Sequence, residues 1–291
     1  MSAARATLSG VREGGRRPKL AGGRILTVTA LLALAIIVLA AILGNWLAPH
    51  DPALQNVELG PSGPSATHLL GTDDLGRDVM SRLLAGAHTA LVAPVLIALG
   101  TTLLGTTLGL LAGYHRGWLD AVLMRLGDLL YALPGLLILI VLVGIAGGGT
   151  TIAVLALIVL GAPVDIRIIR SLALAQRELA YVDAARTLGL PDRRIIFRHL
   201  LPNLAPTVTA NLLLSFVSAL VTLTGLSFLG IGLPAGTADW GLMIQENRTL
   251  LDLNPWAAVA PALLIMITAI AATLLGDSIF ERLSAGKGVP E

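Results

Sequence analysis

The stretch from Glu178 to Asn203 reads ELAYVDAARTLGLPDRRIIFRHLLPN, and it is polar, rich in arginine and helix-forming. Segments on both sides of it are apolar enough to lie in lipid. A water-exposed segment between two membrane spans is suited to binding another protein, because its ends are fixed while its polar surface stays accessible. We therefore expect the surrounding spans to form the fold and this segment to carry an interaction.

The composition indicates a membrane protein. The chain has 291 residues, of which 55% are hydrophobic and 13% charged, too little polar surface to cover a water-soluble protein of this size. A helix of about 20 apolar residues crosses the roughly 30 Å hydrocarbon core of a bilayer. We expect an all-α, multi-pass protein of the cell membrane with six transmembrane helices. The predicted spans are Ile25 to Leu47, His88 to Gly113, Ala121 to Ala146, Thr151 to about Arg170, Ala205 to Gly232, and Trp256 to Phe280.

The fourth span carries Asp165 and Arg167 near its end, so we expect it to leave the hydrocarbon around Pro163. The first span is longer than the apolar core of a signal peptide and no small-residue cleavage site follows it, so we expect it to stay as an anchor.

The distribution of charge gives an orientation. Arginine and lysine dominate residues 1–24, and arginines recur through residues 163–204, whereas residues 48–87 are mainly acidic. Because basic segments remain in the cytoplasm, both termini and the segment 163–204 are expected inside, which requires an even number of spans. The predicted organisation is a cytoplasmic tail (1–24), a first transmembrane helix (25–47), an extracytoplasmic loop and helix (48–87), a transmembrane core (88–280) containing the loop 178–203, and a cytoplasmic tail (281–291).

Within the loop, a short amphipathic helix is predicted. Tyr181, Ala184, Ala185 and Leu188 are spaced at i, i+3, i+4 and i+7 and share one helix face. Gly189 can adopt the left-handed conformation that ends a helix. An amphipathic helix lying on the inner leaflet is the alternative to a protein-docking helix.

A second short helix is expected after Pro191. Asp192 can cap it, Arg193 to His199 form it, and Pro202 breaks it. On the other side of the membrane, Asp73 or Asp74 can cap a helix that starts at Leu75.

Small and hydroxylated residues recur in the spans. Gly105, Gly109 and Gly113 place one flat stripe along a helix, where another backbone can approach closely. Hydroxyl-bearing residues of the fifth span either bond to neighbouring carbonyls or line a translocation path; the path candidates are Ser215, Ser218 and Thr222.

Several functions are disfavoured. The chain has no cysteine, and its five histidines lie on different segments without ligand spacing, so neither a metal site nor a cofactor is expected. Nucleic-acid binding is disfavoured because the basic segments lack interleaved aromatic residues. No phosphate-binding GxxxxGK[ST] loop is present, and the spans offer no paired nucleophile and base. We therefore expect a chain without catalysis of its own.

The pattern Asp183-Ala184-Ala185, Gly189 and His199-Leu200-Leu201-Pro202 resembles the EAA loop of ABC-importer permeases. Four further strings resemble the C-type permease subunit of the dipeptide/oligopeptide/nickel family, and together they cover most of residues 68–283. They are HLLGTDDLGRDVMSRLLAGAHTAL (68–91), GYHRGWLDAVLMRLGDLLYALPGLL (113–137), LTGLSFLGIGLPAGTADWGLMIQENR (223–248) and PWAAVAPALLIMITAIAATLLGDSIFERL (255–283). Asp183 stands where the loop usually has glutamate, and APVDIRII lacks the aromatic residues usual at the end of span four.

The resemblance implies a type I ABC-importer permease fold. It implies as partners a homologous second permease, two ABC ATPase subunits and an extracytoplasmic substrate-binding protein, with ATP hydrolysed on the separate chains. The cargo it implies is di- or oligopeptides, with nickel chelates and sugars open. The residues it places against an ATPase are Tyr181, Asp183, Ala184, Ala185, Leu188, Gly189, Leu201 and Pro202. An ion-driven secondary carrier is the alternative; it would need an ionisable residue or an interrupted helix at the bilayer midplane, and the sequence shows neither.

Overall fold

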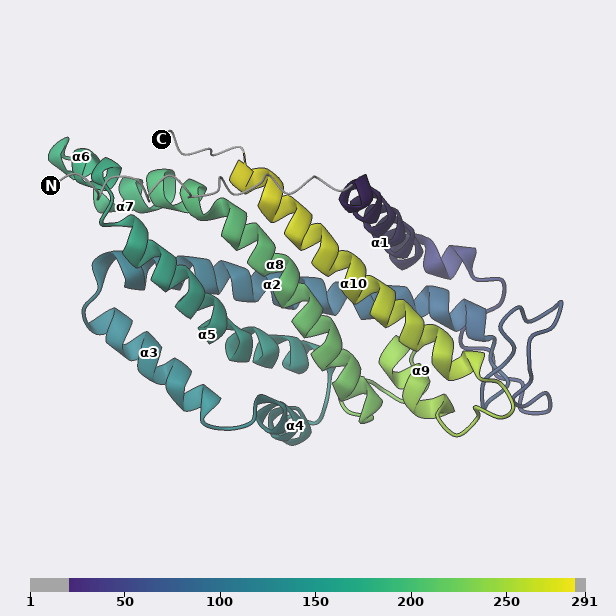
Figure 1. Ribbon diagram of the computed structural model, residues 1–291. Helices are drawn as coiled ribbons and strands as arrows, with labels where there is room; N and C mark the ends of the chain where they lie inside the picture. Colours follow the sequence, from purple (N-terminus) through teal and green to yellow (C-terminus); the bar gives the residue numbers. More distant parts are fainter. Residues whose placement is uncertain (1–20, 286–291) are drawn as a thin grey trace, which may run out of the picture.

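The computed structural model describes residues 21–285, and most of them lie in helices that form one elongated bundle (Figure 1). Most of the predicted N-terminal tail and the end of the C-terminal tail lie outside the described residues. The helices are α1 (Ala21–Leu47), α2 (Val79–His115), α3 (Trp118–Tyr131), α4 (Gly135–Ile145), α5 (Thr150–Gln176), α6 (Ala180–Thr187), α7 (Asp192–Ile195), a π-helical turn (Ile196–Leu200), α8 (Leu201–Phe228), α9 (Trp240–Asn247) and α10 (Trp256–Ala285).

The bundle has two distinct ends. Helices α6 and α7 lie at one end, which we call the α6 end, and α9 with the long loop before α2 lies at the other, the α9 end (Figure 1). Among the described residues, five helices are long and apolar enough to cross a membrane, or six if the bent pair α3–α4 counts as one span. The prediction of an all-α, multi-pass membrane protein is confirmed.

The third predicted span, Ala121 to Ala146, is not one straight helix. Helix α3 ends at Tyr131, α4 begins at Gly135, and the two axes differ by 84°. Pro134 occupies the N-cap of α4 with a φ of −59°. Proline has no N–H to donate and disfavours a helical conformation of the residue before it, so the chain breaks at this point.

The fourth span, by contrast, is longer than predicted. Helix α5 continues through Pro163 to Gln176, and Asp165 does not end it. The Asp165 carboxylate is buried and accepts hydrogen bonds from Thr102 at 3.5 Å and Ser215 at 3.4 Å. Because neighbouring helices supply these donors, the acidic residue can stay inside the bundle.

Helix α2 begins earlier than the predicted second span and differs at its cap. Its 37 residues extend about 55 Å at 1.5 Å per residue, well beyond the hydrocarbon core. Asp78 is the N-cap and accepts from the Ser81 backbone N–H, so the prediction that Asp73 or Asp74 caps a helix starting at Leu75 is wrong.

The glycine stripe of α2 faces α5. A Cβ built on Gly105 would lie 2.2 Å from Cβ of Asp165, and one on Gly113 would lie 2.7 Å from Cβ of Ala173. The same holds at Gly109, where the carbonyl oxygen of Ile166 is 2.9 Å away. The predicted close approach of two backbones is therefore confirmed, and it packs α2 closely against α5 from Gly105 to Gly113.

The loop after α7 also differs from expectation. From Asp192 the chain runs through the π-helical turn into α8 without a break, and Pro202 lies in the first turn of α8. The π-helical turn ends at Leu200, two positions before Pro202, and such a turn changes the local backbone hydrogen-bond register. The predicted helix end at Pro202 is wrong for this reason.

Candidate functional site

The α6 end presents a short helix with one face buried and one face free. Val182 and Ala185 are buried in an apolar cluster with Ile169 of α5, whereas Ala184 and Leu188 are exposed, Leu188 to 81%. The four predicted residues therefore do not form one exposed face, since Ala185 is buried within its own chain. Val182, one position from the predicted stripe, takes the inner position because the helix rotates its bulkiest aliphatic residue inward.

Tyr114, at the end of α2, links the long helices to this short one. Its hydroxyl donates to Oδ1 of Asp192 at 2.7 Å, and Nε of Arg186 donates to that hydroxyl at 3.3 Å. The Arg186 guanidinium also lies over the Tyr114 ring, 5.1 Å from its centroid. Nη1 of Arg177 donates to the Tyr114 carbonyl at 2.6 Å. Displacement of α6 or α7 therefore acts directly on the end of α2.

Gly189 forms the turn between α6 and α7. Its φ is +73°, the left-handed conformation predicted from the sequence, and a Cβ there would meet no atom within 4 Å. The predicted capping by the Asp192 side chain is wrong, because Pro191 is the N-cap of α7 and makes no side-chain cap bond. Beyond the turn is an open groove of about 430 Å³, lined by Pro191, Arg193, Arg194 and Phe197.

The remaining residues predicted at this end are spread over both faces. Asp183 is exposed and accepts a hydrogen bond from Arg186 Nη1 at 3.3 Å. Tyr181 is half-buried, and its hydroxyl donates to Oε1 of Gln176. Leu201 is half-buried beside the apolar cluster that contains Val182 and Ala185, and Pro202 is exposed. Among the exposed residues at this end, one group surrounds the turn at Gly189, and we call it the α6 surface: Asp183, Ala184, Leu188, Gly189, Arg193, Arg194 and Phe197.

A second feature is a half-open cavity between α5 and α8. It has a volume of about 510 Å³ and is lined by residues of α2, α3, α4, α5 and α8. Asp165 lies in its wall, more than nine-tenths buried, and no arginine, lysine or histidine lies within ion-pair distance of it among residues 21–285. The three hydroxyl residues predicted as path candidates, Ser215, Ser218 and Thr222, line the same cavity.

Asp165 lies near the middle of the 27-residue helix α5. From the sequence, Asp165 is expected near the end of its span, whereas it lies near the middle of α5; the statement that no span is interrupted is wrong for the bent pair α3–α4 when the pair counts as one span. The first difference followed from ending the hydrocarbon part of the fourth span at Pro163, and the second from treating Ala121 to Ala146 as one straight helix across Pro134. The signal available in the sequence was the hydroxyl and amide series on α8, including Asn211, which is buried and lines the cavity with Asp165.

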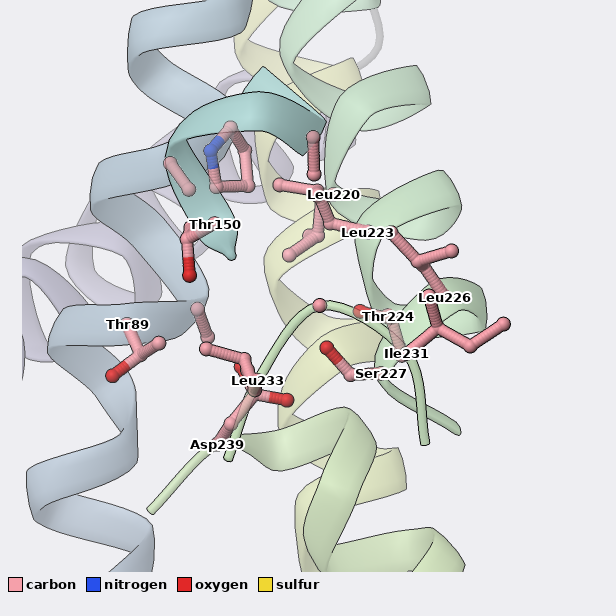
Figure 2. A pocket seen from close by; sticks show the side chains of 15 residues that line it. Thr89, Thr150, Leu220, Leu223, Thr224, Leu226, Ser227, Ile231, Leu233 and Asp239 are labelled. Carbon is pink, nitrogen blue, oxygen red and sulfur yellow. The ribbon is translucent and has the colours of Figure 1, made fainter. Parts of the chain in front are cut away.

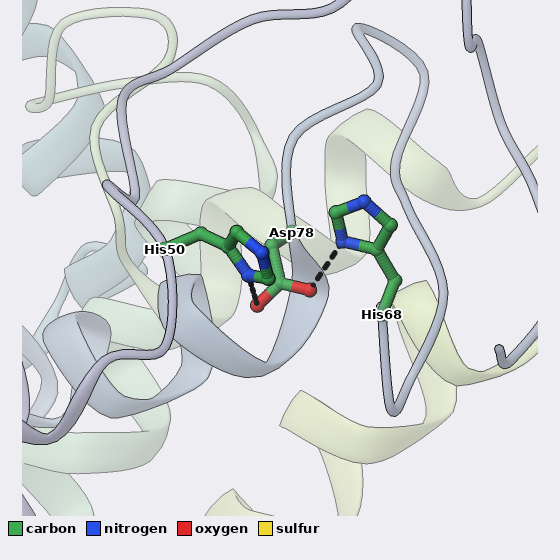
Figure 3. A group of neighbouring side chains, drawn as sticks. All are labelled: His50, His68 and Asp78. Atoms are coloured by element: carbon green, nitrogen blue, oxygen red, sulfur yellow. Dashed lines mark hydrogen bonds and ion pairs between the residues drawn. The ribbon is translucent and has the colours of Figure 1, made fainter. Parts of the chain in front are cut away.

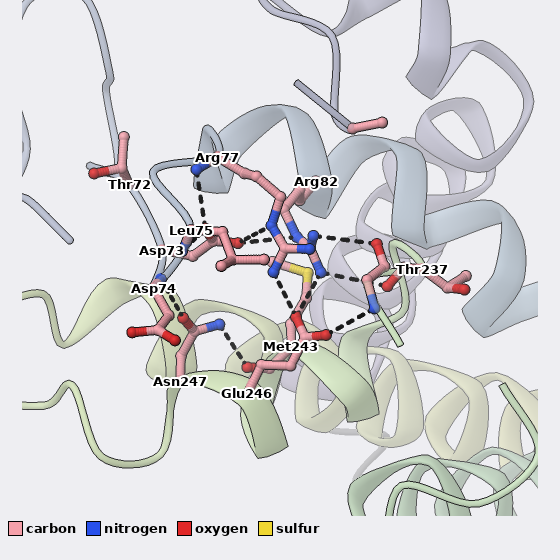
Figure 4. A network of polar contacts seen from close by, with 12 residues as sticks. Thr72, Asp73, Asp74, Leu75, Arg77, Arg82, Thr237, Met243, Glu246 and Asn247 are labelled. Carbon is pink, nitrogen blue, oxygen red and sulfur yellow. Dashed lines mark hydrogen bonds and ion pairs between the residues drawn. The ribbon is translucent and has the colours of Figure 1, made fainter. Parts of the chain in front are cut away.

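At the α9 end, four charged residues, three of them buried and Glu246 partly buried, hold α9 against the start of α2 and the loop before it (Figure 4). Glu246 accepts from Arg77 at 2.8 Å and from Arg82 at 2.9 Å, and Asp73 accepts from Nε of Arg77 at 2.7 Å. The side chains of both arginines are at most 2% exposed. We call Asp73, Arg77, Arg82 and Glu246 the α9 clasp. Two positive and two negative charges balance within it, which is the condition for keeping such groups out of water.

The loop before α9 is joined to the same clasp. Gly236 N–H donates to Oε1 of Glu246 at 3.0 Å, and Arg82 donates to the Thr237 carbonyl at 3.3 Å. Nearby, a partly open pocket of about 30 Å³, sufficient for one water, lies between α2, the start of α5 and the end of α8 (Figure 2). Asp239 lies in its wall and caps α9; burial raises the pKa of this carboxyl, against the hydrogen bonds from Leu242, Ser227 and Gly241.

Asp78 is the centre of a third cluster at the α9 end. His68 Nδ1 lies 2.9 Å from Oδ1 of Asp78, and His50 Nδ1 lies 3.8 Å from Oδ2. Burial would raise the pKa of Asp78, but hydrogen bonds from Ser81 and His68 outweigh it and lower the pKa below its ordinary value. A metal site is disfavoured by the sequence because the histidines lack ligand spacing along the chain. In the folded chain, however, His50 and His68 lie beside the same carboxylate, that of Asp78.

Comparison with known proteins gives a consistent result. The family model described as "Binding-protein-dependent transport system inner membrane component" matches residues 105–286, and that described as "N-terminal TM domain of oligopeptide transport permease C" matches residues 26–61. The chain is 36% identical over 257 residues to the glutathione transport system permease protein GsiD of Pectobacterium atrosepticum, covering 88% of this chain and 85% of that protein. It is 33% identical over 258 residues to the dipeptide transport system permease protein DppC of Alkalihalophilus pseudofirmus, with 89% and 85% covered.

A solved structure supports the fold. An inward-facing form of the MetNI methionine ABC transporter contains a chain that superposes with a TM-score of 0.56 at 18% identity. The match covers 70% of this chain and 97% of that one. At this identity the likeness concerns the arrangement of helices alone.

Proposed function

The chain belongs to the family of binding-protein-dependent transport system inner membrane components, and from this premise we propose that it forms half of an ATP-driven import path for peptides. It is a multi-pass membrane permease. The proposal adds that ATP is hydrolysed on two separate ABC ATPase subunits, that a homologous second permease forms the other half of the path, and that a substrate-binding protein delivers the cargo.

The α6 surface is the proposed contact with the ATPase. It combines an exposed leucine, an exposed alanine and a glycine turn with two arginines, so a partner can pack closely and also pair with charge. Its link to the long helices through Tyr114 supports this role, because movement imposed on α6 reaches α2 without an intervening loop. A helix lying on the inner leaflet is less compatible with the buried Val182 and Ala185, whose apolar face is already occupied.

The cavity beside Asp165 is the proposed part of the cargo path. It is half open, and Ser215, Ser218 and Thr222 of α8 line it. Peptides carry many donors and acceptors, so a path for them needs polar groups that can exchange hydrogen bonds with passing cargo. An unpaired carboxylate in the wall favours cargo with a positively charged amino group.

The α9 end is the proposed docking side for the substrate-binding protein, and both termini are proposed to lie in the cytoplasm. The predominance of basic residues in segments 1–24 and 163–204 supports this orientation. The names of the relatives point to glutathione and dipeptides as cargo of those proteins, and we propose a peptide of this size here.

One experiment tests the proposal. The chain is co-purified with its partners, reconstituted in vesicles with the binding protein, and assayed for uptake of radiolabelled alanyl-alanine and glutathione. Uptake is expected when ATP is present on the side of the membrane that the α6 end faces. It is expected to be absent when a non-hydrolysable analogue replaces ATP. The mid-span Asp165 and the broken α3–α4 span also fit an ion-driven carrier. Uptake that persists without ATP and is abolished by ionophores would establish that alternative instead.

A further inference from the structure

We propose that His50, His68 and Asp78 form a binding site for one divalent transition-metal ion at the α9 end. The three residues come from separate segments: His50 follows α1, His68 lies in the long loop, and Asp78 caps α2 (Figure 3). One ligand atom from each lies within 4.8 Å of the others. The metal site does not depend on the proposed cargo or on ATP hydrolysis.

The spacing of the ligand atoms is close to what a metal requires. A tetrahedral ion with bonds of about 2.0–2.1 Å holds its ligand atoms roughly 3.3 Å apart. His68 Nδ1 and Oδ1 of Asp78 are 2.9 Å apart, and His50 Nδ1 is 3.8 Å from Oδ2. The three ligand atoms lie within 4.8 Å of one another, so His50 must move by roughly 1.5 Å or less to complete the site, and a half-exposed imidazole can do this by rotating its side chain.

Neighbouring atoms hold the ligands in position. Oδ2 of Asp78 accepts from the backbone N–H and the hydroxyl of Ser81, and the side chain of Asp78 is 2% exposed. The backbone N–H of His50 donates to the same Ser81 hydroxyl at 3.0 Å, and that of His68 donates to Ser65 Oγ at 3.0 Å. The carboxylate and both histidine backbones are thus fixed before an ion arrives, as in metal sites whose ligands are oriented by a surrounding hydrogen-bond layer.

His50 supplies the observation that points to a cation. Its Nδ1 atom is buried and has no hydrogen-bond partner among residues 21–285, although it is directed at a carboxylate oxygen. A ring nitrogen lone pair and a carboxylate oxygen are both acceptors, so their approach is favourable only with a proton or a metal ion between them. At His68 a proton accounts for the short contact. At His50 the longer separation leaves room for a larger cation.

The ligand types define the class of ion. Two imidazole nitrogens and one carboxylate suit Zn²⁺, Ni²⁺ or Co²⁺, whereas Mg²⁺ and Ca²⁺ prefer oxygen ligands throughout. Three protein ligands leave a coordination position for water or an incoming group, and the half-exposed His50 leaves the ion accessible from solution. A bound ion would tie the loop before α2 to the start of that helix.

Binding is tested on the full chain, purified in nanodiscs with an affinity tag free of histidine and cysteine and stripped of metal. Titration calorimetry with Zn²⁺, repeated with Ni²⁺, is expected to give one equivalent bound and a raised unfolding temperature. His50→Gln and His68→Gln should each weaken binding by at least tenfold and abolish the thermal shift. His50→Gln should still fold in the absence of metal, because the backbone N–H bond to Ser81 is kept and the side chain loses only its contacts with His68 and Asp78.

The matched control is His115→Gln. His115 Nδ1 lies 3.9 Å from Asp192 at the α6 end, a histidine–aspartate pair with no second histidine. This variant should bind metal like the wild-type chain. Absence of stoichiometric binding by the wild-type chain, or equal affinity of His50→Gln and wild type, would overturn the assignment. Equal loss in His115→Gln would show that the ion binds elsewhere.

Discussion

The hydroxyl of Tyr114 donates a 2.7 Å hydrogen bond to Asp192, joining the last turn of α2 to the first residue of α7. Tyr114→Phe removes that bond and the hydrogen bond from Arg186, while the ring stays in its apolar cluster with the Arg186 guanidinium over it. Each such bond contributes about 1 kcal/mol, so the chain should still assemble. We expect the assembled complex to hydrolyse ATP with several-fold less uptake per ATP. Unchanged uptake per ATP would show that this link does not transmit movement.

Substitutions at two adjacent alanines of α6 can test ATPase docking and folding separately. Ala184 is exposed, whereas Ala185 is buried with Val182 and Ile169. Ala184→Arg should leave the thermal stability of the chain unchanged and prevent co-purification of the ATPase. Ala185→Arg places a charge in an apolar cluster and should lower the yield of folded chain. Co-purification assays and thermal unfolding distinguish the two; an ATPase retained by Ala184→Arg argues against the proposed contact.

The stripe on α2 provides a test of packing. Gly105→Ala puts a methyl group where Cβ of Asp165 already lies 2.2 Å from the ideal position, and the overpacking should cost about 1–3 kcal/mol. The control is Gly225→Ala in α8, where a Cβ meets nothing within 4 Å. That variant should be neutral or more stable by up to about 1 kcal/mol. Thermal unfolding in detergent measures both, and equal effects would contradict the α2–α5 contact.

Asp165 can be tested with an isosteric change. Asp165→Asn keeps the shape and an acceptor for Ser215, so stability should be nearly unchanged, while uptake of alanyl-alanine should fall at least tenfold. Asp165→Leu also removes the acceptor and should destabilise the chain. The control is Thr273→Val in α10, a residue whose hydroxyl bonds only within its own helix. Wild-type uptake by Asp165→Asn would mean that the negative charge has no role in transport.

The α9 clasp predicts a large difference between two ion pairs. Glu246→Gln leaves two buried arginines with the carboxylate of Asp73 alone, at a cost of about 3–5 kcal/mol. The Arg167–Asp128 pair is half-exposed on both sides, and Asp128→Asn should cost at most about 1 kcal/mol. Unfolding temperatures of the two variants make the comparison. Similar values would indicate that water reaches the clasp.

The sequence predicts well what depends on neighbours along the chain. The first span agrees with α1, the glycine stripe faces another helix, and Gly189 adopts the left-handed turn. Each of these follows from local composition or from a backbone preference of one residue type. The errors arise where tertiary contacts override a local rule: donors from α2 and α8 keep Asp165 inside a span, and a π-helical turn carries the chain past Pro202.

The side-chain clusters are harder to predict because their members are far apart in sequence. Arg82 and Glu246 are separated by 164 positions, and neither lies in a pattern that indicates the other. His50 and Asp78 likewise carry no spacing signal, since an extended loop rather than a helix brings them together. The balance of charges depends on contacts that exist only in the folded bundle, so it cannot be predicted from a single sequence.

The pairing of Arg82 with Glu246 has a consequence for synthesis on the ribosome. At about 5–20 residues per second, the 164 intervening positions take roughly ten to thirty seconds to translate. Throughout that interval Arg77, just before α2, and Arg82, in its first turns, lack the counter-ion that Glu246 supplies. The segment 105–286 that matches the family model includes Glu246 but neither arginine. A nascent chain released early, or a core expressed alone, therefore exposes an unbalanced charge that cellular quality control can recognise and degrade.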